Sequence, residues 1–288
     1  MRAAILLAFS VAAMVPSSVG ATAQKCLSRG CTQASAAPAT TIMYGADSRQ
    51  GIDLYVPDRG IEAAPLVVFI HGGGWSFGDR GGVERKASHF ARHNLAFASA
   101  GYRVLPDAPV ETQAEDLAMA ISALRGEAPR WGYDADRIVL MGHSAGAHLA
   151  ALLATQDNLL GEDMEAIRGV ILLDGAAYDI PAQMAGPGRQ IQRIYQRVLG
   201  TDPQRQRALS PIHHVGGADA PHWLALYVSG RKASKAQSEM FMAKLAQTGA
   251  RASAIAIPDT DHRHINRNTG IPGDPATAAI DAFLARVF

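Results

Sequence analysis

The chain has 288 residues, of which 48% are hydrophobic, and its formal net charge is +1 at pH 7. This length suits a single α/β domain of ordinary size, and the apolar content supports a sizeable core. Because the charge is close to zero and no basic stripe is interleaved with aromatic residues, the composition argues against a nucleic-acid partner.

Residues 1–23 have the features of a secretory signal peptide. Arg2 gives a positive start, the apolar stretch 3–15 is too short to span a membrane as a mature helix, and 21–23 (Ala-Thr-Ala) is a small-x-small cleavage site. We therefore expect a mature chain that begins near Gln24, is secreted or periplasmic, and keeps no integral membrane segment after cleavage.

Residues 24–42 are predicted to form a linker, because the stretch 32–41 is rich in Ala, Ser, Thr and Pro. The two cysteines of the chain, Cys26 and Cys31, lie in this segment. An oxidising compartment would permit them to pair, and the alternative is two unpaired thiols. A bridge between them would close a small loop and add little to the stability of the core.

Residues 43–288 are predicted to form one α/β domain, because strand and helix patterns alternate along them. Alternation of this kind is typical of a mostly parallel central sheet with helices on both faces, and no separate lid domain is visible in the sequence.

The connection 176–215 is the one long insertion, and its part 189–199 has helical spacing. The expected strands are 65–70, 137–141, 169–173, 222–228 and 251–257, and the other expected helices are 83–93, 114–125, 146–154, 237–247 and 276–286.

A glycine-rich loop, His71-Gly-Gly-Gly-Trp75, directly follows the first of these apolar runs. Acyl transfer builds negative charge on a carbonyl oxygen, which preorganised backbone N–H groups stabilise by several kcal/mol. Gly73 and Gly74 are the expected donors from this loop. The alternative is that the glycines only form a flexible turn.

The pentapeptide Gly142-His-Ser-Ala-Gly146 lies between an expected strand and an expected helix. Strand, tight turn and helix are the context in which the G-x-S-x-G pattern forms a nucleophile elbow. Ser144 is therefore the candidate nucleophile, and the N–H of Ala145 is the third expected oxyanion donor.

The candidate general base lies near the C-terminus, because the order along this fold is serine, acid, histidine. His262 follows the expected strand 251–257, and His264 is its rival two residues later. We favour His262, which lies nearer the strand end that would position it. A metal pair formed by the two histidines would lack a third and a fourth ligand of suitable spacing, so no metal is predicted.

The acid of the triad is absent from its usual place, because the loop 229–237 after strand 222–228 contains no carboxylate. Asp174, at the end of the neighbouring strand 169–173, is the best substitute. Two alternatives stay open: the acid has moved to Asp174, or the chain is a weakened enzyme in which Asp174 only hydrogen-bonds the turn after its strand.

From about Met43 onward, the chain resembles the α/β-hydrolase superfamily, and more narrowly the esterases related to hormone-sensitive lipase and kynurenine formamidase. The resemblance places the nucleophile at Ser144, the base at His262 and the oxyanion donors at Gly73, Gly74 and Ala145. The acid of these relatives would fall near Ala233, where they carry Asp before Ser. The resemblance is carried by the segments 44–47, 52–57, 71–79, 102–106, 113–117, 133–138, 142–146 and 262–267.

These features predict a secreted serine carboxylic-ester hydrolase that forms an acyl-enzyme on Ser144 with His262 as base. Its partner is a small-molecule ester, and no cofactor is implied. One alternative is an amidase or formamidase that uses the same groups. The other is a weakly active or non-catalytic binding protein, because Ala233 stands where the acid is usual.

Overall fold

The computed structural model describes residues 38–57, 63–186 and 189–288. The predicted signal peptide and most of the predicted linker, with Cys26 and Cys31, lie outside the described residues. None of the helices in the described ranges combines the length and apolar character that a membrane span needs.

Eight strands of the described chain form one sheet in the order β1-β2-β4-β3-β5-β6-β7-β8. The pairs β1–β2 and β2–β4 are antiparallel, and every other pair is parallel. The carboxyl ends of β3, β5, β6, β7 and β8 therefore meet at one edge, where α/β folds place their sites. The strands are β1 (Thr40–Met43), β2 (Gly51–Tyr55), β3 (Ala64–Ile70), β4 (Ala96–Ala100), β5 (Tyr133–His143), β6 (Ile167–Leu173), β7 (His222–Val228) and β8 (Arg251–Ile257).

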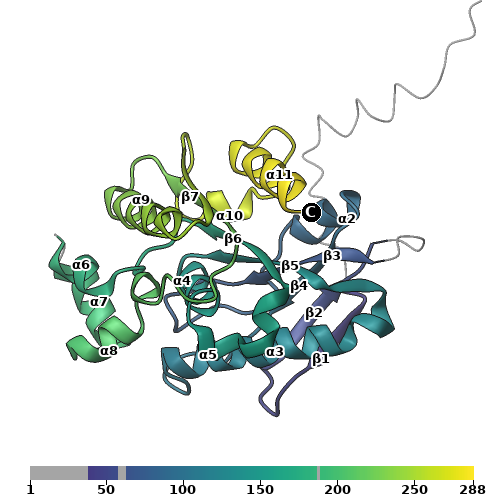
Figure 1. Cartoon of the computed structure of the whole chain (residues 1–288), viewed down its shortest axis with the longest axis horizontal. Helices are drawn as coiled ribbons and strands as arrows, with labels where there is room; N and C mark the ends of the chain where they lie inside the picture. The colour runs from purple at the N-terminus through teal and green to yellow at the C-terminus, as the bar shows by residue number, and fades with distance from the viewer. Residues whose placement is uncertain (1–37, 58–62, 187–188) are drawn as a thin grey trace, which may run out of the picture. The chain divides into compact units, whose positions relative to one another are not determined.

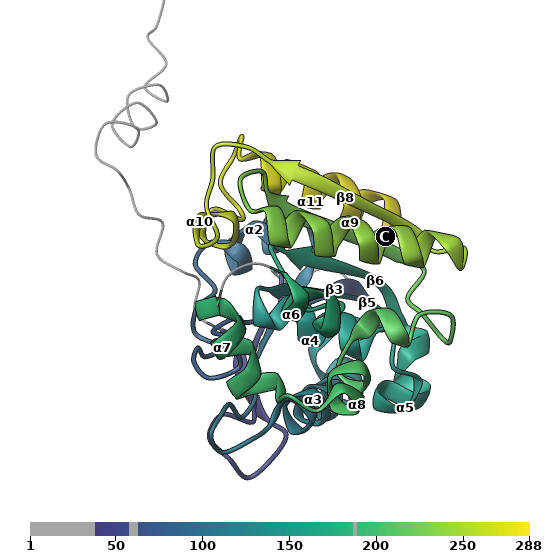
Figure 2. The same ribbon diagram turned by 90° about the vertical axis from the view of Figure 1, so that its left-hand side faces the viewer.

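Helices cover both faces of this sheet (Figure 1). The elements before β6 are α2 (Lys86–Arg92), α3 (Val110–Trp131), α4 (Ala145–Leu153), α5 (Asp157–Leu160) and the short helix η1 (Gly161–Ala166). Those after β6 are α6 (Ile180–Ala185), α7 (Arg189–Leu199), α8 (Pro203–Ala208), η2 (Pro211–His213), α9 (Lys232–Gln247), α10 (His264–Arg267) and α11 (Pro275–Val287). The long connection from β6 to β7 contains α6, α7 and α8, which Figure 2 shows gathered beside α4.

Side chains of β3 alternate between two buried cores. Leu66 and Val68 belong to the core that α3 and α4 cover, whereas Val67 and Phe69 belong to the core under α2 and α11. Successive side chains of a strand point to opposite faces, so a continuous apolar run is expected where both faces are covered. The predicted fold class, a mostly parallel sheet with helices on both faces, is confirmed.

Two of the expected helices, 114–125 and 237–247, differ most from the observed bounds. Helix α3 continues past Gly126 and Pro129, whose poor helix propensity favoured an earlier end, and stops at Gly132, which takes the left-handed conformation with φ 76°. Helix α9 begins at Lys232 instead of Gln237, which places Ala233 in its first turn.

Candidate active site

Ser144 lies in a sharp turn between β5 and α4. Its backbone has φ 55° and ψ −117°, a conformation that costs free energy for a residue with a side chain. The turn is possible because its neighbours are small: a Cβ on Gly142 would lie 2.2 Å from the Gly146 carbonyl oxygen, and one on Gly146 would lie 2.2 Å from that of Ile70. The predicted strand, turn and helix around Ser144 are therefore present.

His262 lies in the loop after β8, and its Nε2 is 3.0 Å from the Ser144 Oγ. His143, the residue before the serine, supports this loop: its Nε2–H donates to the His262 carbonyl oxygen at 2.7 Å, and the two ring centroids are 4.7 Å apart. Burial, with a smaller effect of a charge on His262, lowers the pKa of His143 to about 4. A neutral His143 therefore donates from Nε2 at neutral pH.

The rival histidine has a different partner. The Nδ1 of His264 lies 2.7 Å from an oxygen of Asp261, and both side chains are more than half exposed. The loop thus brings His262 to Ser144, while His264 pairs with a carboxylate at the surface.

Asp174 follows β6 and lies on the far side of the His262 ring. Its Oδ2 accepts from His262 Nδ1 at 2.7 Å, and its Oδ1 accepts from the Val228 N–H at 3.1 Å. Asp174 itself has a positive φ of 45°, so a sharp turn at the end of β6 directs this buried side chain across the neighbouring strand. The distances connect Ser144, His262 and Asp174 in the order that a serine hydrolase requires.

The Asp174 carboxylate is held in its charged form. Burial acts to raise its pKa, but the hydrogen bond from His262, the positive charge of Arg231 and the Val228 N–H together lower it to about 2. Asp174 is therefore ionised throughout the neutral pH range and accepts hydrogen bonds without donating one.

Arg231 is a further charged residue at this site, and the sequence predicts no role for it. Its Nη1 contacts both the Oδ2 of Asp174 and the Nδ1 of His262, while its side chain remains 40% exposed. The only sequence signal was the presence of a cation in the loop where related enzymes carry the acid.

Ala233, the expected place of the acid, lies exposed in the first turn of α9. The next residue, Ser234, is buried, and its hydroxyl donates to the Gly175 carbonyl oxygen at 2.9 Å. The loop after β7 thus approaches the end of β6 through Ser234 and Arg231, and the carboxylate nearest to His262 in the described chain is that of Asp174.

The glycine-rich loop runs against the serine. A Cβ on Gly72 would lie 3.1 Å from the Cβ of Ser144, and one on Gly73, at φ 125°, would lie 2.1 Å from the Phe77 carbonyl oxygen. In the described chain, no backbone carbonyl outside the regular helices and strands accepts from the N–H of Gly73, Gly74 or Ala145. These are the three expected oxyanion donors, and they are free to bind an acceptor.

Aromatic side chains form a wall beside this loop. The buried Trp75 packs edge-on against Tyr195 of α7, with 5.9 Å between ring centroids. Trp75 also donates from Nε1 to His148 Nδ1 at 3.3 Å, and His148 Nε2 donates to the Leu209 carbonyl oxygen at 2.8 Å. The long β6–β7 connection, through α7 and Leu209, therefore fixes the loop that follows β3.

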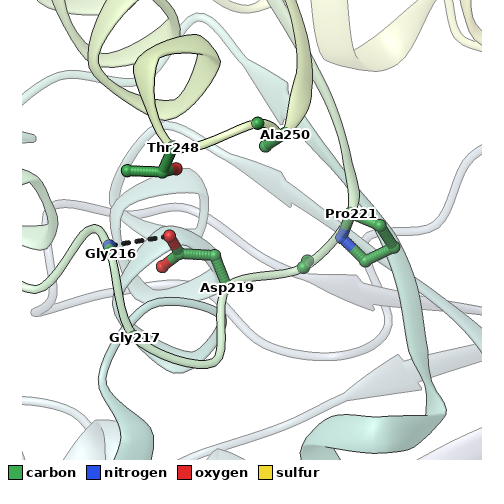
Figure 3. Close-up of a pocket in the computed structure, with 8 residues that line it drawn as sticks. Gly216, Gly217, Asp219, Pro221, Thr248 and Ala250 are labelled. Carbon is green, nitrogen blue, oxygen red and sulfur yellow. Dashed lines mark hydrogen bonds between the residues drawn. The ribbon is translucent and has the colours of Figure 1, made fainter.

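A hollow of about 250 Å³ lies before β7 and β8, at the edge of the sheet opposite to Ser144 (Figure 3). Asp219 lies in it and accepts from the Gly216 N–H at 2.8 Å, and burial raises the pKa of its carboxyl. Its lining contains no histidine and no serine, so this hollow lacks the groups for acyl transfer. It is lined by Gly216, Gly217, Asp219, Ala220, Pro221, Thr248, Gly249 and Ala250.

Comparison with known proteins identifies a family model and relatives that cover most of the site region. The BD-FAE family model matches residues 52–245, a segment that contains the glycine-rich loop, Ser144, Asp174 and Arg231 but ends before His262. Kynurenine formamidase of Danio rerio is 24% identical over 222 residues, which cover 77% of this chain and 73% of that protein.

Two further relatives are esterases. A probable isoprenylcysteine alpha-carbonyl methylesterase of Arabidopsis thaliana is 33% identical over 111 residues, which are 38% of this chain. The chain spans only 23% of the length of that protein. The structure of an esterase from Thermogutta terrifontis with propionate bound has a TM-score of 0.70 at 22% identity, covering 86% of this chain and 94% of the other.

Proposed function

Because the chain belongs to the BD-FAE family and has the α/β-hydrolase fold, we propose that it is a serine carboxylesterase that forms an acyl-enzyme on Ser144. The observation that carries the proposal is the continuous set of contacts at the site. Ser144 Oγ lies 3.0 Å from His262 Nε2, and His262 Nδ1 lies 2.7 Å from Asp174 Oδ2.

In this mechanism, the neutral His262 accepts the Ser144 proton at Nε2 while Oγ attacks the ester carbonyl carbon. The resulting imidazolium carries the proton to the departing alcohol, and the acyl group remains on Oγ. His262 then takes a proton from water, which attacks the acyl-enzyme, and returns it to Ser144 as the acid product leaves. Asp174 stays ionised, orients the ring through Nδ1 and stabilises its positive charge.

The two tetrahedral intermediates place negative charge on the former carbonyl oxygen. We assign its stabilisation to the free N–H groups of Gly73, Gly74 and Ala145, which come from the loop after β3 and the first turn of α4. Removing one donor from such a site typically costs about 10²–10³-fold in turnover.

The proposed substrate is a small ester with a short acyl group. Two observations support this size: the wall of Trp75 and Tyr195 beside the oxyanion loop, and the propionate bound to the related Thermogutta esterase. The likeness to kynurenine formamidase favours a second candidate, a formamidase or amidase that uses the same three side chains on a poorer leaving group.

A panel of p-nitrophenyl esters of increasing acyl length, run beside a p-nitroanilide and N-formylkynurenine, separates these functions. We expect the highest kcat/KM on a short-chain ester. Faster turnover of N-formylkynurenine than of every ester would assign the formamidase function instead.

Labelling with a fluorophosphonate probe tests the nucleophile. The probe should modify Ser144, and the variant Ser144→Ala should lose labelling and ester turnover together. If Ser144→Ala hydrolysed short esters as fast as the parent protein, the assignment would be wrong.

We also propose that the protein is exported to a periplasm or to the medium. The support is the positive Arg2, the apolar stretch 3–15 and the small residues at 21–23. Protein isolated from the native host should begin within a few residues of Gln24, as read by N-terminal sequencing. A cytosolic product that keeps Met1 would contradict export.

A further inference from the structure

Two histidines and one aspartate meet on the face of the sheet that α2 and α11 cover. His89 lies in α2, His93 is the residue that caps its C-terminus, and Asp281 lies in α11. One potential ligand atom from each residue lies within 4.8 Å of the others. The group belongs to neither the Ser144 site nor the hollow of Figure 3.

The local structure explains why these side chains converge. Residues four positions apart share one face of a helix, so His89 and His93 lie next to each other, with 4.6 Å between ring centroids. His89 Nε2 reaches across to α11 and lies 2.8 Å from Asp281 Oδ1. An ion pair between α2 and α11 would need only His89 and Asp281. His93 adds a second imidazole, whose ring nitrogen is a potential metal ligand like that of His89.

We propose that His89, His93 and Asp281 form a binding site for Zn²⁺. Imidazole nitrogen and carboxylate oxygen are the ligand types that this ion takes in proteins besides thiolate. Tetrahedral ligands about 2.0–2.2 Å from zinc lie roughly 3.3–3.6 Å from one another, so small side-chain rotations would bring the three atoms onto one ion. Water would fill the fourth position.

The burial of the three residues suits such a site. His89 is only 5% exposed and Asp281 is partly buried, which shields two ligands from competing water. His93 is exposed and leaves a path by which the ion enters. Bound zinc would fasten α2, which follows β3, to α11, which follows the His262 loop, and we assign it no step of ester hydrolysis.

Zinc titration of the whole, chelator-treated protein by isothermal calorimetry tests the site. We expect one saturable site in the parent protein and at least about tenfold weaker binding in His93→Ala and in Asp281→Asn, because each variant loses a ligand. His93 is exposed, so its replacement leaves the packing of α2 intact. Thermal unfolding should show a zinc-dependent rise in Tm in the parent that His93→Ala loses.

His264→Ala is the matched control, because His264 and Asp261 form an exposed histidine–aspartate pair at 2.7 Å, which no third potential ligand among the described residues joins. This variant should bind zinc as the parent does. The site is overturned if His93→Ala and the parent give the same isotherm, if the parent does not bind zinc, or if His264→Ala removes the strong site.

Discussion

The loops that follow β6 and β7 present opposite charges to the same histidine. The turn after β6 carries the buried carboxylate of Asp174, whereas the loop after β7 carries the guanidinium of Arg231 and no carboxylate between 229 and 237. The relatives that the chain resembles have their acid in the second of these loops. The comparison teaches that a carboxylate at the end of a neighbouring strand can reach the same histidine nitrogen, which is the basis for proposing Asp174 as the acid.

Sheet geometry makes this exchange possible. β6 and β7 are adjacent and parallel, with Leu173 opposite Leu226, and the N–H of Asp174 donates to the Leu226 carbonyl oxygen at 2.7 Å. Adjacent strands lie about 4.8 Å apart, so a side chain that turns sideways at the end of β6 reaches the space above the end of β7. The positive φ of Asp174 provides that turn.

The largest expected effect follows from removing the carboxylate after β6. Asp174→Asn should lower kcat on a short p-nitrophenyl ester by about 10³–10⁴-fold, because an asparagine neither stabilises the imidazolium nor holds the ring in the required tautomer. Steady-state kinetics measure the loss, and circular dichroism establishes that the variant is folded.

The matched change in the other loop is Ala233→Asp. Ala233 is exposed in the first turn of α9, so a carboxylate there points to solvent and should change kcat by no more than about twofold. A large gain from Ala233→Asp, together with no loss from Asp174→Asn, would mean that the chain is a weakened enzyme that lacks its acid.

A smaller effect is expected from removing the cation after β7. The groups that face His262 are Ser144 and His143 at the β5 end, Asp174 after β6 and Arg231 after β7. The guanidinium contacts both Asp174 and His262, so Arg231→Gln should lower kcat/KM on a short ester by no more than about tenfold, because the contact between Asp174 and His262 remains.

Two further variants isolate the effect of this charge. Arg231→Lys keeps the positive charge and should restore most of the parent kcat/KM. Lys232→Gln removes an exposed charge next to Arg231 in sequence and should leave kcat/KM at the parent value. An unchanged kcat/KM in Arg231→Gln would mean that the guanidinium does not help to hold Asp174 and His262.

The smallest effect concerns stability at acid pH. The pKa of Asp174 is lowered from its ordinary value of 3.8 to about 2 in the folded protein, so its charged form stabilises the fold. This contribution is fully present above about pH 3.8 and is lost as the pH falls toward 2. It amounts to about 2 kcal/mol. Between about pH 5 and pH 2.5, the unfolding free energy should fall more for the parent than for Asp174→Asn. Equal pH dependence in urea titrations would contradict this.

The sequence was sufficient for the fold and for the turn at Ser144, because those depend on local patterns, whereas it left open whether Asp174 or no residue serves as the acid. The strands 222–228 and 251–257 have the predicted bounds, and the turn at Ser144 follows from glycines that a Cβ would obstruct. These features are encoded within a few residues of one another, as propensity and turn chemistry are.

The contacts of Arg231 could not be predicted in the same way. They depend on where α9 begins. The sequence predicts a start at Gln237, whereas the helix begins at Lys232 in the structure. A shift of this size decides whether 231–233 form a long loop over the site or the first turn of a helix. The His89, His93 and Asp281 group was missed for a related reason, since α2 and α11 are far apart in the sequence.

A double-mutant cycle of kcat/KM on one short ester tests the central claim, that Asp174 acts through His262. Asp174→Asn is made in the parent protein and in His262→Ala, and the two losses are compared. The account predicts a loss of about 10³-fold or more in the parent and almost none in His262→Ala, because no imidazole remains to be oriented. Equal losses in the two backgrounds would show that Asp174 acts independently of His262 and would contradict its assignment as the acid of the site.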